Sequence, residues 1–121
     1  IILAGHIGKA VKIAGGIYNT HSRTADCRME IMGANAFLIG EKPENIMKIL
    51  KANTVEEACE YVEKQELFSL IAEKAAAKCR EYVRDENISC EVMLFSFSGK
   101  ELGHSRNFYE LLNEVSSVEK N

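Results

Sequence analysis

The chain has 121 residues, of which 46% are hydrophobic, and a formal net charge of −3 at pH 7. That length and apolar content suit one compact domain with a real core and exclude two full domains. No apolar run approaches the roughly 20 residues that a membrane-spanning helix needs, and the acidic balance argues against a nucleic-acid surface.

The first elements predicted are a strand, a turn and a helix. Residues 1–4 are apolar and read as the tail of a strand that begins upstream, so we expect a fragment of a longer protein. Gly5 and Gly8 predict a tight turn, after which apolar residues recur at helical spacing up to a glycine pair at 15–16. Residues 17–24 lack a helical period and predict a loop, with Thr24 as the N-cap of the next helix.

That next helix is predicted over about residues 25–38. It is apolar nearly all round after Glu30, which indicates a buried helix. Amphipathic helices follow at about 43–52, opened by Pro43, at 55–62, after a capping box formed by Thr54 and Glu57, and at 66–84.

Residues 89–97 (SCEVMLFSF) are apolar on both faces and predict a central strand, parallel to the first. Residues 98–100 predict a turn, residues 107–115 a final helix, and the last six residues a frayed end. The predicted fold class is therefore α/β, with helices packed around a small parallel sheet whose strands lie near 1–4 and 89–97. We expect residues 1–121 to form a single domain or a fragment of a larger protein.

The four cysteines lie within apolar patterns and have no CxxC spacing: Cys27, Cys59, Cys79 and Cys90. Free thiols in a reducing cytoplasm are the expected state. A zinc site or a disulfide is the alternative.

Charge is distributed unevenly along the chain. Residues 1–39 carry four Lys or Arg against two Asp or Glu, whereas the remainder carries eleven against sixteen. A mildly basic N-terminal third suits a small anionic ligand better than a polyanion.

Polar residues cluster inside this basic third, beginning with GHIGK at 5–9. Because this string follows a strand and opens a helix, its unpaired N–H groups and the helix dipole favour a carboxylate or phosphate. Lys9 and Lys12, three residues apart on one predicted helix face, would reinforce that preference. The alternative is an ordinary glycine turn with solvated lysines.

The predicted loop adds Asn19, Thr20, His21 and Ser22. His21 is able to act as acid, base or donor near neutral pH, while its neighbours orient a polar ligand. The alternative is a loop that caps its own backbone.

Asp26 and Glu30 lie four residues apart, so two like charges share one face of the predicted buried helix. A structural ion-pair network and a functional role both account for them. A metal site made of His6, His21, Asp26 and Glu30 is chemically allowed, but its spacings match no metal signature and we assign no metal.

Taken together, GHIGK and the downstream KIAGGIYNTHSRTADCRME resemble the C-terminal region of the cobalt-precorrin-5B C1-methyltransferase family, CbiD, of anaerobic cobalamin biosynthesis. The likeness is densest over residues 3–38. Beyond Gly40 only the order of helices, strand and helix agrees. Because family members are considerably longer, the resemblance implies that the N-terminal portion of the same protein is a partner of this chain, which we expect to be inactive alone.

The resemblance also implies transfer of a methyl group from S-adenosylmethionine to carbon-1 of a cobalt-containing tetrapyrrole with many carboxylates. The protein would mainly align donor and acceptor and exclude water. The catalytic residues expected on this basis are His6, His21 and Asp26. The residues expected to contact substrate or cofactor are Gly5, Gly8, Lys9, Asn19, Thr20, Ser22, Arg28 and Glu30.

Two other hypotheses remain open at this point. One is a non-catalytic domain that binds an anionic ligand or mediates assembly, including assembly into a homo-oligomer. The other is that the polar cluster only stabilises a buried helix, in which case its replacement would lower stability without a selective effect on methyl transfer.

Overall fold

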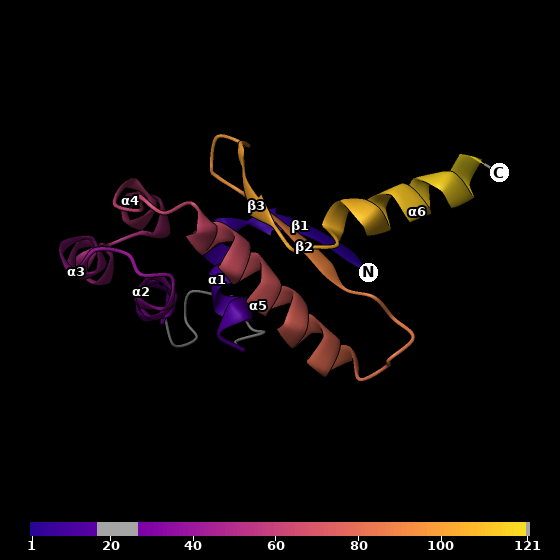
Figure 1. The fold of residues 1–121 in the computed structure, drawn as a ribbon, viewed down its shortest axis with the longest axis horizontal. Helices are drawn as coiled ribbons and strands as arrows, with labels where there is room; N and C mark the ends of the chain where they lie inside the picture. Colours follow the sequence, from indigo (N-terminus) through magenta and orange to yellow (C-terminus); the bar gives the residue numbers. More distant parts are fainter. Residues whose placement is uncertain (17–26, 121) are drawn as a thin grey trace.

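The computed structural model describes residues 1–16 and 27–120, with side chains described up to residue 116. Three strands form one sheet in the order β1-β2-β3 (Figure 1). β1 (Ile2–His6) pairs in parallel with β2 (Glu91–Phe95), which pairs antiparallel with β3 (Glu101–His104). The α/β class and the parallel pairing of the two predicted strands are confirmed, and the chain adds a third strand.

β3 was not predicted because its sequence, ELGH, is short and only weakly β-forming. Its strand conformation depends on pairing with β2, where Leu94 lies opposite Gly103. Gly103 also faces α5 (Glu66–Val83) closely, since a Cβ at this position would lie 3.0 Å from the backbone carbon of Phe68. The missing side chain therefore lets the third strand approach the long helix.

The predicted tight turn between Gly5 and Gly8 is wrong. β1 continues to His6, and α1 (Ile7–Ala14) begins at the next residue, so Gly5 belongs to the strand and Gly8 to the helix. His6 takes extended dihedral angles and caps α1, which allows the chain to pass from strand to helix without a loop.

The hydrophobic core lies between the sheet and the helices α1 and α5, which pack against each other. Val11 of α1 and Ile71 of α5 are fully buried, together with Leu94 of β2. Because α1 also contacts α2 and α4, it is buried on nearly all sides. Lys12 is consequently only 1% exposed whereas Lys9 is exposed, so the prediction that the two lysines share one face of this helix is wrong.

α2 (Arg28–Leu38) is not buried all round, contrary to the prediction. It buries one stripe that contains Met32 and Ala36 against α1 and α3, while Phe37 and Leu38 are 72% and 62% exposed. Glu30 is exposed as well, so its charge carries no burial cost. The predicted residues 25 and 26 of this helix lie outside the described part of the chain.

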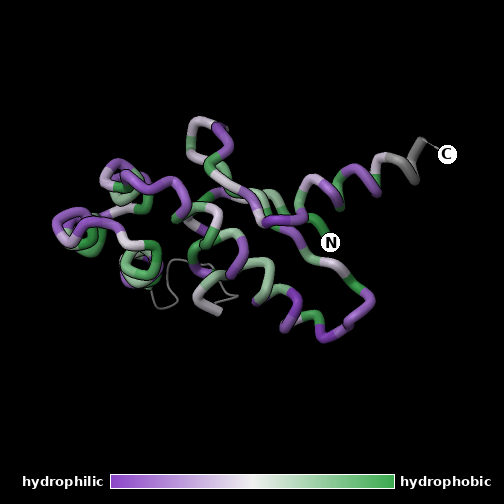
Figure 2. Tube along the Cα trace, viewed as in Figure 1, coloured by the Kyte–Doolittle hydropathy of each residue, from purple (hydrophilic) through white to green (hydrophobic). Residues whose placement is uncertain are grey.

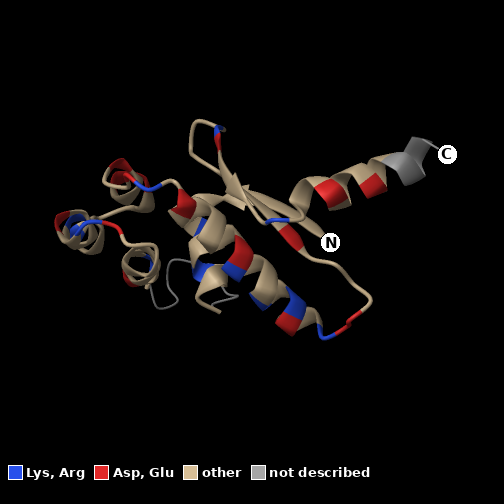
Figure 3. Ribbon diagram, viewed as in Figure 1, with Lys and Arg blue, Asp and Glu red and all other residues tan. Residues whose placement is uncertain are grey.

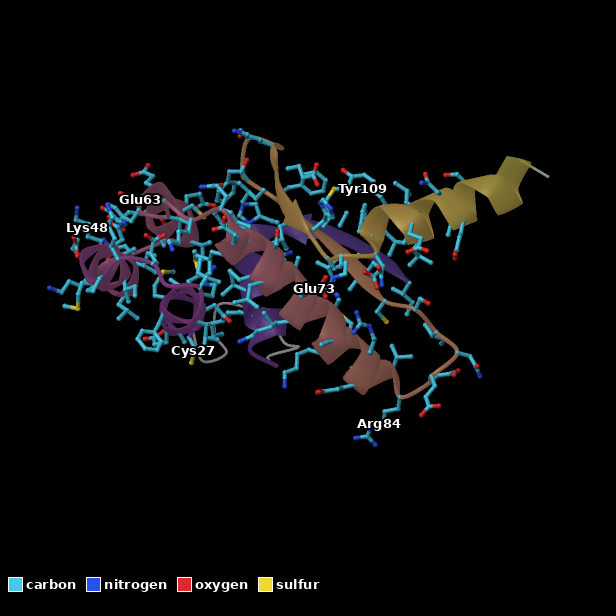
Figure 4. All side chains as sticks on the ribbon, viewed as in Figure 1. Cys27, Lys48, Glu63, Glu73, Arg84 and Tyr109 are labelled. Atoms are coloured by element: carbon cyan, nitrogen blue, oxygen red, sulfur yellow. The ribbon has the colours of Figure 1, made fainter. Side chains whose placement is uncertain are left out.

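Three further helices complete the fold: α3 (Pro43–Lys51), α4 (Val55–Glu60) and α6 (Phe108–Lys120). Figure 1 shows α2, α3 and α4 gathered at one end and α6 projecting from the other. α6 continues past the predicted end at residue 115. Its first turn carries Tyr109, which is labelled in Figure 4. The ring of Tyr109 lies near that of His104 on β3, with centroids 4.8 Å apart.

None of the helices within the described residues combines the length and the apolar character that crossing a membrane requires. The four cysteines carry free thiols, and of these only Cys90 is fully buried.

Candidate functional site

A cleft of about 580 Å³ opens where the carboxyl ends of the parallel strands β1 and β2 meet. Ligands of sheets with parallel strands commonly bind beyond the carboxyl ends of those strands. Four parts of the fold supply the lining residues: His6, Gly8 and Lys9 at the β1–α1 junction, Arg28 of α2, Thr54, Val55 and Glu56 of α4, and Phe97 after β2. The structure therefore brings His6, Gly8, Lys9 and Arg28 together, as expected of a common site.

His6 is held in one orientation by contacts on three sides. Its Nδ1 accepts a hydrogen bond from the backbone N–H of Gly8 at 3.1 Å, which places the ring proton of neutral His6 on Nε2. The imidazole ring lies against the ring of Phe97, with centroids 4.1 Å apart. Its Nε2 lies 3.2 Å from Oε1 of Glu56.

The His6–Glu56 contact leaves two buried polar atoms short of a hydrogen bond. Although Nε2 and Oε1 are within ion-pair distance, neither makes a well-aligned hydrogen bond to anything in the described part of the chain. Buried polar atoms are nearly always satisfied in folded proteins. Both residues line the cleft, so the His6–Glu56 contact forms a polar part of its wall.

Gly8 allows two side chains to approach the start of α1. A Cβ at this position would lie 3.3 Å from Nδ1 of His6 and 3.5 Å from a guanidinium nitrogen of Arg28. The absence of a side chain thus keeps Arg28 close to the capped helix end. Among the described residues that line the cleft, Arg28 and the exposed Lys9 are cationic and Glu56 carries a carboxylate.

Sequence reasoning missed Glu56 and Phe97. Glu56 lies in the first turn of α4, an acidic stretch visible in Figure 3, and in sequence it resembles any other helix-start glutamate. Phe97 follows an apolar strand and is 73% exposed. Neither residue carries a local signal, because each becomes part of the cleft only through the packing of α4 and of the β2–β3 connection beside His6.

The other predicted site residues either lie away from the cleft or belong to the residues that the structure does not describe. Gly5 lines a separate apolar hollow rather than the cleft, and Glu30 is exposed on α2 and does not line the cleft either. Asn19, Thr20, His21, Ser22 and Asp26 lie outside the described residues, so their predicted roles stay predictions. Over residues 1–16 and 27–120 the structure shows no group of three potential metal ligands.

Residues 19–106 match the family described as CbiD, C-terminal domain. The chain belongs to the CbiD family. This match confirms the resemblance and extends it well beyond residue 40, where the sequence offered no diagnostic motif.

Relatives in the CbiD family are similar over nearly the whole chain. The chain is 52% identical over 118 residues to the cobalt-precorrin-5B C(1)-methyltransferase of Fusobacterium nucleatum, a match that covers 98% of this chain and 31% of that protein. The protein of the same name from Clostridioides difficile is 38% identical over 117 residues, with 93% and 29% coverage. The one from Methanocaldococcus jannaschii is 39% identical over 107 residues, with 85% and 29% coverage.

The chain thus spans about 30% of the length of these curated relatives. No solved structure shows significant similarity to it.

Proposed function

We propose that this chain forms part of a cobalt-precorrin-5B C1-methyltransferase, which transfers a methyl group from S-adenosylmethionine to carbon-1 of the cobalt-bound tetrapyrrole in anaerobic cobalamin biosynthesis. The observation that carries the proposal is the cleft at the carboxyl ends of β1 and β2, with its two cations and its unsatisfied His6–Glu56 pair. Relatives that bear this enzyme name are similar in sequence over most of the chain.

The chemistry of the cleft suits a flat ligand with many carboxylates. Lys9 and Arg28 offer charge-assisted hydrogen bonds to carboxylates, and the guanidinium group binds them in a bidentate manner. Phe97 and the ring of His6 supply a flat apolar surface for the edge of a macrocycle. We therefore assign this cleft to side-chain carboxylates of the tetrapyrrole substrate.

S-Adenosylmethionine supplies a methyl group on a positively charged sulfur. The described lining of the cleft holds two cationic side chains and one carboxylate, a composition that suits an anionic substrate better than a sulfonium group. We therefore place the reactive end of the methyl donor outside this cleft, on the part of the full-length protein that the relatives carry in addition. On this view residues 1–121 are inactive alone, and the full-length enzyme works in the cytoplasm.

His6 acts in this proposal as an oriented hydrogen-bond donor. Because its Nδ1 is occupied by the N–H of Gly8, only Nε2 is able to serve a ligand, and Nε2 carries the proton in the neutral ring. A substrate carboxylate that approaches Nε2 would satisfy it and would take the place of Glu56 as its neighbour. The contribution of His6 is thus positioning of the substrate, which is the main requirement for methyl transfer between bound reactants.

Steady-state kinetics of the full-length enzyme test this assignment. Lys9→Met should raise KM for the tetrapyrrole by about 10-fold, the equivalent of one lost charge-assisted hydrogen bond, and leave KM for S-adenosylmethionine unchanged. Lys51→Met, at the exposed end of α3, is the matched control. A selective rise in KM for the methyl donor would place the donor in the cleft and refute the assignment. Unchanged turnover in folded His6→Ala and Lys9→Met variants would favour a non-catalytic role for the domain.

A further inference from the structure

The outer edge of β1 has no strand partner among the described residues. β1 is the first strand of the sheet, and within the described residues its only strand partner is β2. The N–H of Glu91 donates to the carbonyl of Ile1, and Ile2 lies opposite Glu91. In a parallel pair successive residues alternate, so the backbone groups of Leu3 and Gly5 face β2 while those of Ile2 and Ala4 face outward.

The sequence of β1 lacks the residues that normally prevent an edge from pairing with a further strand. Proteins protect exposed edges with lysines, prolines, bulges or covering elements. The sequence of β1, ILAGH, contains no lysine, proline or acidic residue. Ile1 and Leu3 are 50% and 37% exposed, and Figure 2 shows the trace at the N-terminus as hydrophobic. An unprotected apolar edge of this kind favours the addition of a strand.

An apolar hollow lies beside the same edge. It measures about 190 Å³ and lies between β1, α1 and α5, where Ala10, Ala75 and Cys79 leave space between the larger side chains of Leu3 and Ile13. A dry apolar cavity of ~150 Å³ is large enough to hold benzene. The hollow therefore has the size and the chemistry to hold one large apolar side chain from a neighbouring strand.

The lengths of the relatives indicate which segment pairs with the edge of β1 and fills the hollow. The chain matches about 30% of their length, and the matching family is the C-terminal domain of CbiD proteins, so these relatives carry a large additional part. We propose that a β-strand from that additional part of the full-length protein pairs with the outer edge of β1 and inserts a large apolar side chain into the β1–α1–α5 hollow. The added strand extends the sheet beside His6 and so supplies a further wall of the cleft.

Amide hydrogen exchange in the full-length protein, read residue by residue, tests the pairing. The outward N–H groups of Ile2 and Ala4 should exchange about as slowly as those of Leu3 and Gly5, on the order of 100-fold more slowly than an open edge allows. Fast exchange at Ile2 and Ala4 alongside slow exchange at Leu3 and Gly5 would overturn the proposal. Protection of Ala4 that disappears on dilution to monomer would identify a second copy as the occupant and would equally overturn it.

A pair of variants at Cys79 tests the hollow. Cys79→Phe fills it and should restore fast exchange at Ile2 and Ala4, whereas protection at Leu3 and Gly5 persists because β1 still pairs with β2. Cys79→Ala keeps the hollow open and should leave all four of these N–H groups protected from exchange. Unchanged protection of Ala4 in folded Cys79→Phe would show that no side chain enters the hollow. None of these measurements depends on methyl transfer, so they remain informative if the proposed activity is wrong.

Discussion

A buried carboxylate, Glu41, connects the α2–α3 junction to the α4–α5 junction. Its Oε1 accepts hydrogen bonds from the N–H of Lys42 at 3.1 Å and from Nδ2 of Asn45 at 3.0 Å, and its Oε2 accepts from the N–H groups of Glu63 and Lys64 at 3.0 and 2.9 Å. Burial alone would raise the pKa of Glu41, but the four hydrogen bonds outweigh burial and lower the pKa from 4.5 to about 2. The folded protein therefore favours the charged form.

The sign of the pH dependence follows from this shift. Because the folded-state pKa of Glu41 lies below the unfolded value, its contribution to stability is fully present above pH 4.5 and is lost as the pH falls towards 2. The difference in pKa corresponds to about 3 kcal/mol in the free energy of unfolding. Glu41→Gln keeps one acceptor oxygen but turns an NH₂ group towards the N–H groups of Glu63 and Lys64. We expect this variant to lose about 2–3 kcal/mol at pH 7.

Urea unfolding between pH 7 and pH 2.5 measures both effects. The wild-type protein should lose stability steeply below pH 4.5, and Glu41→Gln should lose much less over the same range. Glu44→Gln, in the first turn of α3 and exposed, is the control and should follow the wild type. Parallel loss of stability in the wild type and Glu41→Gln would show that another group titrates and would refute the reasoning.

Three further outcomes are expected. Gly103→Ala would place a Cβ 3.0 Å from the backbone of Phe68 and should lower the free energy of unfolding by about 1–3 kcal/mol. Gly5→Ala is the control and should leave the free energy of unfolding unchanged, because its Cβ meets nothing within 4 Å. Equal losses of stability in the two variants would contradict the close approach of β3 to α5. Thr54→Ala removes the oxygen that accepts from the backbone of α4 and should cost about 1 kcal/mol in urea unfolding, most of which Thr54→Ser should recover. Burial raises the pKa of Cys59 to about 11, so iodoacetamide at pH 8 should alkylate this thiol slowly until urea unfolds the protein; rapid labelling of the folded protein would contradict its burial.

Elements with strong local signals were predicted well. The apolar stripe of α5 and the proline at the start of α3 depend on neighbours within a few residues, and these positions are helical as expected. At α4, the N–H of Glu57 donates to Oγ1 of Thr54 at 3.1 Å, as the capping-box pattern predicts, although the Glu57 carboxylate accepts from Asn53 rather than from Thr54. Figure 4 shows Arg84 at the far end of α5, where a positive φ of 56° terminates the helix at the predicted residue.

Burial was predicted less well than helicity, because composition does not say which sides of a helix meet neighbours. After Glu30 the sequence of α2 is apolar except for Asn35, and that of α1 contains two lysines, yet α1 is surrounded by the sheet and three helices while α2 leaves Phe37 exposed. Lys12 is buried for the same reason. β3 likewise exists only because β2 offers a partner at its edge.

By itself, the sequence determined the family, the α/β class, most helices and the polar string at the start of α1, since local periodicity, capping chemistry and contiguous motifs carry that information. Only the tertiary structure decided that Glu56 and Phe97, distant from His6 in the sequence, form the other walls of the cleft. The physical reason is that a side chain's partners across a cleft depend on how separate elements pack, and packing depends on the summed contacts of the whole chain rather than on any short segment.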